Sequence, residues 1–232
     1  MLSYAVALVA ITALVMVYRR DRRRLQSQRA QFFDHCLGLF QSYRITQEGP
    51  TYPLLSGRYR GYEARLEPVV DNMAWRKVPV LWLRATILKP NAYAGVLDLL
   101  VRPGGVEVYS PSSDLDYHLT LPEGWPEQAL LCTDDPSSIP PLELLTPHMK
   151  RFADPYMKEL VVSPRGVRLV RMIWQASRLN YAVFREIRFE GTYLDPALAK
   201  DLLDAAIDIA DALAKPDSVT RIPPGRSMAK VA

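Results

Sequence analysis

The chain has 232 residues, of which 49% are apolar and 23% are charged, so it can bury a core and is not a disordered chain or a multi-span transporter. The formal charge is +4, but the excess of positive charge lies in two flanks, residues 19–29 and 215–230. The rest of the chain carries a formal charge of −4, and therefore no nucleic acid is expected as a partner. The two cysteines, Cys36 and Cys132, lack disulfide or zinc-ligand spacing and are expected to be inert, buried thiols.

The first segment of the chain, residues 2–18, contains no charged side chain. As an α-helix it would reach about 26 Å, close to the roughly 30 Å core of a bilayer. The pattern predicts a single transmembrane helix over residues 1–18, the alternative being a buried helix of a soluble domain. Under the positive-inside rule, the arginines that follow predict a bacterial inner-membrane protein with its N-terminus outside and a cytoplasmic C-terminal domain.

The segment after the span, residues 19–31, is a basic juxtamembrane region. Its arginines are expected to contact anionic lipid head groups as well as to stop transfer, or to act in topology alone. These are Arg19, Arg20, Arg22, Arg23 and Arg24.

Residues 32–214 are expected to form one α+β domain, a largely antiparallel sheet packed against helices, and residues 215–232 a disordered tail. Apolar residues at a spacing of three and four predict a neck helix over residues 33–43. Alternation predicts a strand over residues 62–67 after a bulge or tight turn at residues 60–61. The apolar run at residues 78–88 predicts a central strand covered on both faces.

Further along the chain, a hairpin is expected from residues 96–101 and 106–110 around the turn at residues 102–105. A strand is expected at residues 117–121, and residues 122–141 are mostly a connection around a short apolar piece at residues 129–132. A short helix is predicted to start at residues 146–147. A second hairpin turns at residues 164–166, a last strand covers residues 181–189, and a final helix runs over residues 195–214.

Two acidic segments are candidate chemical sites. Asp114, Asp116 and His118 alternate, so an extended chain would place them on one face as half of a metal site; the alternative is a polar entry to a strand. Asp134, Asp135 and His148 could combine for acid–base chemistry if the loop folded onto the helix, and the alternative is ordinary turn and cap composition. No cofactor-binding motif is present in the sequence.

Arginines are frequent over residues 165–188, where no lysine occurs. The guanidinium group offers a planar fork for carboxylates and phosphates. An anion or acidic-peptide site is therefore a hypothesis for Arg165, Arg168 and Arg171, against surface ion pairing with nearby glutamates.

The sequence favours a membrane-anchored binding, scaffold or regulatory module with a protein partner over an enzyme. The alternative is a membrane-tethered hydrolase or metal-dependent enzyme that uses residues 114–148. A third hypothesis is a lipid-facing domain in which Trp125 and the proline-rich connection touch the bilayer. The excess of arginine over lysine is typical of a high-GC bacterial genome.

Overall fold

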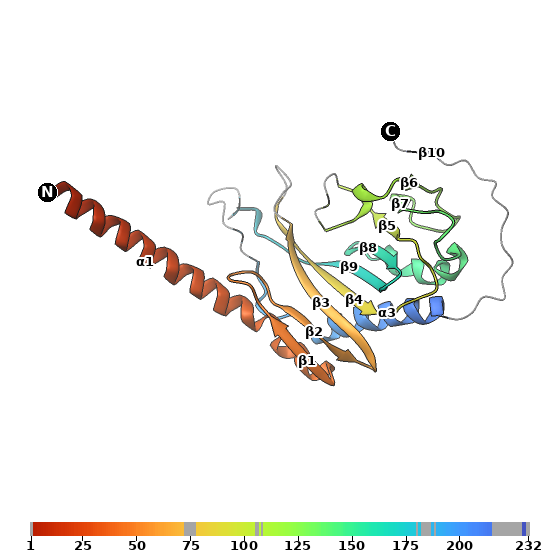
Figure 1. The fold of residues 1–232 in the computed structure, drawn as a ribbon, viewed down its shortest axis with the longest axis horizontal. Helices are drawn as coiled ribbons and strands as arrows, with labels where there is room; N and C mark the ends of the chain where they lie inside the picture. Colours follow the sequence, from red (N-terminus) through yellow and green to blue (C-terminus); the bar gives the residue numbers. More distant parts are fainter. Residues whose placement is uncertain are drawn as a thin grey trace.

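The structure is a computed structural model that describes residues 2–71, 78–104, 107, 109–179, 181, 187, 189–214 and 229–230. Ten strands form one sheet in the order β1-β2-β3-β4-β9-β8-β5-β7-β6-β10, and each neighbouring pair is antiparallel (Figure 1). The strands are β1 (Ser42–Thr46), β2 (Leu54–Tyr59), β3 (Tyr62–Asp71), β4 (Val80–Leu88), β5 (Leu97–Val101), β6 (Tyr117–His118), β7 (Ala129–Thr133), β8 (Met157–Ser163), β9 (Gly166–Gln175) and β10 (Ala229–Lys230). The helical segments are α1 (Leu2–Ala30), η1 (Gln31–Leu39), η2 (Ser112–Asp114), η3 (Leu142–Leu144), η4 (Thr146–Ala153) and α3 (Pro196–Ala214).

The first four strands form a meander of consecutive strands. Between β2 and β3 the chain reverses through Arg60 and Gly61, whose φ angles are 49° and 86°. Two successive positive φ angles match the right-handed twist of the flanking strands, which is why a glycine stands at this turn. The predicted turn at residues 60–61 is confirmed.

The meander joins the rest of the sheet through β4 and β9. The β8–β9 hairpin closes at Ser163 and Gly166, as its turn sequence predicts. Gly166 has a φ of 148°, and a Cβ atom there would overlap the carbonyl oxygen of Ile87 on β4. The junction therefore depends on a residue without a side chain at this position.

One face of the sheet carries the main core. Along β4 the buried residues alternate, and Leu81, Leu83, Ala85 and Ile87 pack in the same core as the apolar face of α3. η1 closes one end of this core, where the Leu194 amide donates to the Phe32 carbonyl. The predicted final helix and the antiparallel sheet packed against helices are present as expected.

The opposite face of the same strands has a smaller buried layer that is separate from the main core. Leu100, Val161 and Val170 lie on this face, and the buried Tyr109 of the segment that follows β5 packs on it against Trp82. Buried charged residues share this layer, because Asp98 and Glu159 are both 0% exposed. β4 is thus covered on both sides, fully on the α3 side and partly on the other.

Three local predictions were wrong. β5 does not form a hairpin with residues 106–110; it pairs with β7 and β8 instead, and the described residues 107, 109 and 110 are not in a strand. The apolar piece placed within a connection is β7, a strand between β5 and β6. The neck helix ends at Leu39 and the chain continues as edge strand β1, because its polar and apolar residues then follow a period of two. The predicted strand over residues 181–189 lies mostly outside the described residues, as does the tail apart from β10.

The predicted membrane span was also wrong. α1 is one continuous helix of 29 residues that projects from the body, and its second half carries the arginines of residues 19–24 (Figure 1). Across the described part of the chain, no helix has the combined length and apolar character needed to traverse a bilayer. The uncharged stretch is short by this measure, since about 20 predominantly apolar residues are needed and the stretch has seventeen residues, of which Ser3 and Thr12 are polar. The single-pass topology depended on that span and loses its basis.

Candidate functional site

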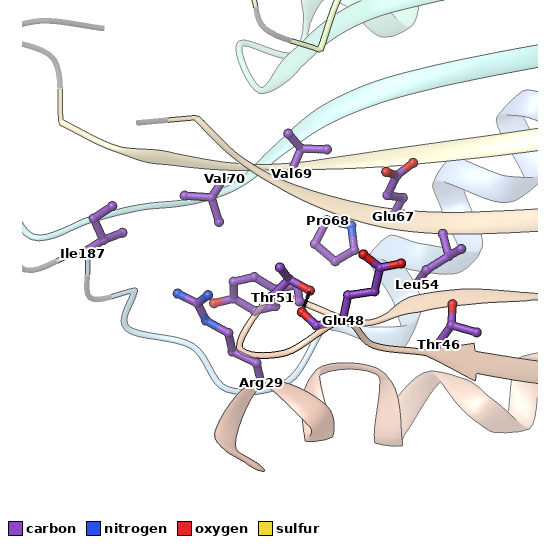
Figure 2. A pocket seen from close by; sticks show the side chains of 11 residues that line it. Arg29, Thr46, Glu48, Thr51, Leu54, Glu67, Pro68, Val69, Val70 and Ile187 are labelled. Atoms are coloured by element: carbon purple, nitrogen blue, oxygen red, sulfur yellow. Dashed lines mark hydrogen bonds between the residues drawn. The ribbon is translucent and has the colours of Figure 1, made fainter. Parts of the chain in front are cut away.

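A groove lies between the end of α1, the β1–β2 connection and β3, and Figure 2 shows the side chains that surround it. Its volume is about 680 Å³, which is within the range of ligand-binding clefts. We call it the α1–β3 groove and define it by its lining residues: Arg29, Thr46, Glu48, Thr51, Tyr52, Leu54, Glu67, Pro68, Val69, Val70 and Ile187.

One wall of the α1–β3 groove is held in place by polar contacts between α1 and the β1–β2 connection. Arg29 donates from Nη1 to the Pro50 carbonyl at 2.6 Å, and its guanidinium lies over the Tyr52 ring, 4.8 Å from the centroid. Gln47 Nε2 donates to the carbonyls of Gln26 at 3.1 Å and Thr51 at 2.8 Å. The connection is therefore fixed to the helix at several points.

Burial of the Tyr52 phenol raises its pKa, and the adjacent Arg29 guanidinium partly offsets this effect. The phenol stays protonated at neutral pH. The Arg29 guanidinium is held against Pro50 and Tyr52, so it stabilises the wall of the groove and is less available to a ligand at the opening.

The rest of the lining is apolar with acidic residues beside it. Leu54, Val69 and Val70 line the groove and are half-buried; Val69 and Val70 are successive residues of β3, so their side chains lie on opposite faces of the strand. Glu48 is exposed, and Glu67 pairs with Arg84 at 3.4 Å while remaining partly exposed. Arg84 thus compensates Glu67, and Glu48 is the lining carboxylate that has no ion pair among the described residues. Beside apolar side chains, such a carboxylate favours a ligand that combines apolar groups with a positive charge.

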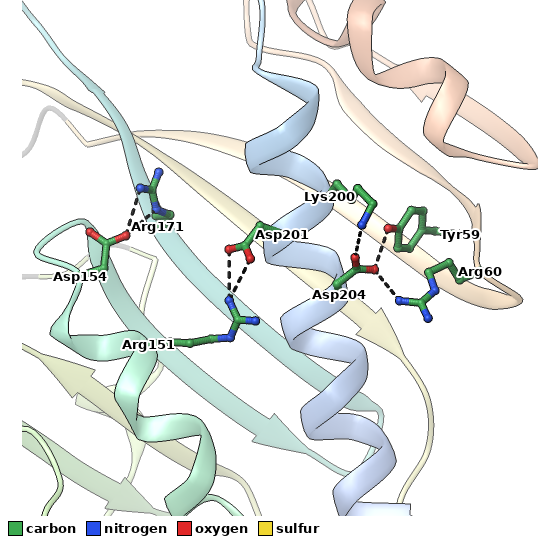
Figure 3. Close-up of polar contacts among 8 residues, drawn as sticks. All are labelled: Tyr59, Arg60, Arg151, Asp154, Arg171, Lys200, Asp201 and Asp204. Carbon is green, nitrogen blue, oxygen red and sulfur yellow. Dashed lines mark hydrogen bonds and ion pairs between the residues drawn. The ribbon is translucent and has the colours of Figure 1, made fainter.

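A second polar region lies along α3, where aspartates face residues of the β2–β3 hairpin and of η4 (Figure 3). Asp204 accepts from Tyr59 at 2.7 Å, Arg60 at 2.8 Å and Lys200 at 2.7 Å. Asp201 pairs with Arg151 of η4 at 3.1 Å. These contacts tie α3 to the β2–β3 turn and to η4, so the aspartates act in packing the helix.

The candidate metal residues are not brought together into a metal-binding group. Asp114 ends η2, Asp116 follows it and His118 lies in β6, and all three are exposed. Among the described residues, no three histidine, cysteine or acidic side chains are grouped so that they could hold a metal ion. The segment serves instead as an entry to a strand.

The second acidic set is divided between two places. Asp134 accepts from the Val96 amide at 2.7 Å, and Asp135 accepts from Ser137 and Ser138 within its own turn. The pKa of Asp135 is lowered by these bonds, that from Ser138 first. His148 is half-buried on η4, and burial lowers its pKa, partly offset by Asp208 of α3. The turn interpretation accounts for the aspartates.

The three candidate anion-binding arginines lie in different places and have different partners. Arg165 is exposed in the β8–β9 turn, Arg168 pairs with Glu159 at 3.2 Å, and Arg171 pairs with Asp154 at 3.0 Å. Arg168 and Arg171 lie on opposite faces of β9, since Arg168 is opposite Thr86 and Arg171 opposite Leu83. The structure does not gather them at one place, and ion pairing accounts for two of them.

The arginines of residues 19–24 are exposed on α1, and their contact with anionic lipid stays a prediction. Arg22 has a structural contact as well, because its guanidinium lies against Gly49 of the β1–β2 connection. Gly49 has a φ of 57°, a conformation that favours glycine.

Comparison with known proteins identifies no family. No protein-family pattern matches the sequence, and no curated protein is similar to it. Among solved structures, the mycobacterial trehalose monomycolate transport factor A, TtfA, aligns with 84% of this chain and 100% of its own, at 11% identity and a TM-score of 0.44. A likeness at this level shows neither a shared family nor a shared function.

Sequence reasoning missed the residues of the α1–β3 groove. Tyr52 and the residues around Val69 are separated along the chain, and their meeting depends on the register between β2 and β3. One local signal was available in residues 68–70, Pro-Val-Val, where the polar alternation of β3 gives way to successive apolar residues.

Proposed function

We propose that the protein is a binding module that takes a segment of a partner protein into the α1–β3 groove and serves as a scaffold or regulatory component. The observation that carries the proposal is the lining itself, in which half-buried apolar side chains lie beside two carboxylates. Such a lining favours a segment in which a lysine or arginine is flanked by apolar residues.

The construction of the groove supports binding. The β1–β2 connection is hydrogen-bonded to α1, so one wall is formed before a partner arrives. A preformed wall reduces the conformational entropy that is lost on association.

The test uses three synthetic peptides that differ at one central position, with lysine, norleucine or glutamate between valines and leucines. Binding to the full chain is followed by the NMR amide signals of Val69 and Val70. We expect the lysine peptide to bind about two- to fivefold more tightly than the norleucine peptide, and the glutamate peptide to bind most weakly.

Charge reversal provides the matched comparison. Glu48→Lys removes a carboxylate from the groove and should invert the order of the three peptides. Glu127→Lys makes the same change at an exposed residue outside the groove and should leave the order unchanged. Equal affinity of all three peptides for Glu48→Lys and for Glu127→Lys would contradict the proposal. Changes of NMR chemical shift that are confined to residues outside the groove would also contradict it.

A further inference from the structure

Asp98 and Glu159 form a buried acidic pair on the face of the sheet opposite α3. Asp98 lies opposite Val161 in the β5–β8 register and Glu159 lies opposite Leu100, so the two carboxyl groups are diagonal neighbours on one face. Both residues are 0% exposed. Two carboxylates this close and this far from water are not both stable in the ionised form.

Each member of the pair has one oxygen bonded and one oxygen unbonded. Ser110 Oγ donates to Asp98 Oδ2 at 2.9 Å, and Arg168 Nη2 donates to Glu159 Oε2 at 3.2 Å. Asp98 Oδ1 and Glu159 Oε1 are buried and accept no hydrogen bond from the residues that the structure describes. A proton on one of these carboxyl groups would supply a donor where the described residues supply none.

The charges around the pair leave one carboxylate without a cation. Lys158 pairs with Glu107 at 3.0 Å, and Arg84 pairs with Glu67 at 3.4 Å. Of the cations that the structure describes around the pair, Arg168 is the one left to bind it, and it contacts Glu159, on which the charge of Arg84 also acts. Among the described residues, the titratable and charged groups around the pair are Lys158 of β8, Arg168 of β9, Arg84 of β4, Cys132 of β7, Asp71 of β3, and Glu107 and Tyr109 of the covering segment, which also carries Ser110.

We propose that Asp98 and Glu159 share one proton at neutral pH, carried by Asp98 and donated to Glu159, and that this proton keeps the segment around Ser110 closed over the sheet. The segment is held by three contacts around the pair: Ser110 on Asp98, Arg168 on the Tyr109 carbonyl at 3.5 Å, and Lys158 on Glu107. Loss of the proton leaves a second buried negative charge. That charge is relieved when the segment opens and admits water.

The direction of titration agrees with the geometry. Burial, followed by the nearby Glu159 carboxylate, raises the pKa of Asp98 to about 8, and burial also raises the pKa of Glu159. A folded-state pKa above that of the unfolded chain stabilises the fold at low pH, and this contribution is lost as the pH rises towards 8. The segment is thus closed in acid and neutral solution and loosened in alkali.

Asp98→Asn tests the proposal, since the amide resembles the protonated acid and cannot ionise. The folding constant is measured by denaturant unfolding of the full chain between pH 5 and pH 9. We expect the folding constant of the wild-type protein, divided by that of Asp98→Asn, to fall as the pH rises. The fall should reach up to about tenfold per pH unit and should level off above pH 8. Asp204→Asn is the control, because the pKa of Asp204 lies at about 2 and its loss should change stability equally across this range. A ratio for Asp98→Asn that is independent of pH would overturn the proposal.

Two further measurements remain decisive even if that variant folds poorly. Infrared difference spectra of wild-type protein carrying ¹³C-labelled aspartate should show an isotope-shifted carbonyl band of a protonated carboxyl at pH 6 that is lost at pH 9. Amide exchange in residues 109–115 of the wild-type chain, corrected for intrinsic rates, should become several-fold less protected over the same range. Absence of the carbonyl band at pH 6, or unchanged protection of the segment, would overturn the shared proton or the closing role respectively.

Discussion

The phenol of Tyr59, at the end of β2, donates a hydrogen bond to Asp204 of α3 at 2.7 Å. The bond connects the β2–β3 hairpin to a helix that follows it by more than a hundred residues in the chain. Arg60 and Lys200 bind the same carboxylate, so one side chain receives three donors. Although partial burial acts to raise it, these bonds hold the pKa of Asp204 down at about 2.

The first prediction concerns this carboxylate. Asp204→Asn should lower the free energy of unfolding at pH 7 by about 1–3 kcal/mol, because bonds to a charged acceptor are lost. The folded-state pKa lies below that of the unfolded chain, so the contribution is present above about pH 4 and is lost as the pH falls towards 2. The wild-type protein should therefore lose more stability than the variant between pH 5 and pH 2 in urea unfolding. Asp208→Asn, at an exposed position of the same helix, is the control and should have little effect at pH 7.

The second prediction tests the approach of β9 to β4. Gly166→Ala should reduce the free energy of unfolding by about 2 kcal/mol or more, since the added Cβ overlaps the Ile87 carbonyl and the φ of 148° is unfavourable for alanine. Gly38→Ala is the matched control, because a Cβ at Gly38 meets no atom within 4 Å. Thermal unfolding that shows equal midpoints for the two variants would contradict the description of the junction.

The third prediction concerns the buried pair of Lys158 and Glu107, whose side chains are 9% and 7% exposed and 3.0 Å apart. Lys158→Met should cost about 3–5 kcal/mol, because Glu107 is then left buried without its cation. The double variant with Glu107→Gln should recover much of this loss. The coupling free energy from the double-mutant cycle measures the pair, and a value near zero would show that the two residues act independently.

The fourth prediction concerns thiol chemistry. Cys36 and Cys132 are buried, and the pKa of each is raised to about 11, by burial first and then by Asp195 for Cys36 and Asp98 for Cys132. Thiolate is the reactive form, so neither residue should react with Ellman's reagent at pH 7.5 in the folded protein. Both should react after unfolding in guanidinium chloride. Rapid reaction of one equivalent in the native state would indicate that one of the two sites opens.

Structural features that depend on residues close together in the chain were predictable from the sequence. The turns at residues 60–61 and 164–166 follow from glycine and proline within short windows, and α3 follows from one apolar stripe along its length. The partners of β5 were not predictable in this way. A glycine-rich turn after β5 favours a local hairpin. The strand instead pairs with residues 129–133 and 157–163, and between these two partners all five of its residues are buried.

The candidate sites show the same contrast between groups that are close in the sequence and groups that only the fold brings together. The acidic residues at 114–118 and 134–135 are conspicuous in the sequence, yet they serve turns and strand entries. Asp98 is the single polar residue of β5 and Glu159 is the single acidic residue of β8, and only the register of β5 against β8 brings them together. An acidic residue inside an otherwise apolar strand is the local signal that would have identified Asp98.

The strand order has a consequence for synthesis on the ribosome. β4 is complete at residue 88, but its neighbour β9 begins at residue 166. At about 5–20 residues per second, translation takes on the order of 4–16 s to cover the interval. During that time one edge of a long, apolar strand has no native partner, and such edges recruit other chains. The nascent protein therefore has a window in which a chaperone bound to β4 would protect it from aggregation, and this window closes when the β8–β9 hairpin docks.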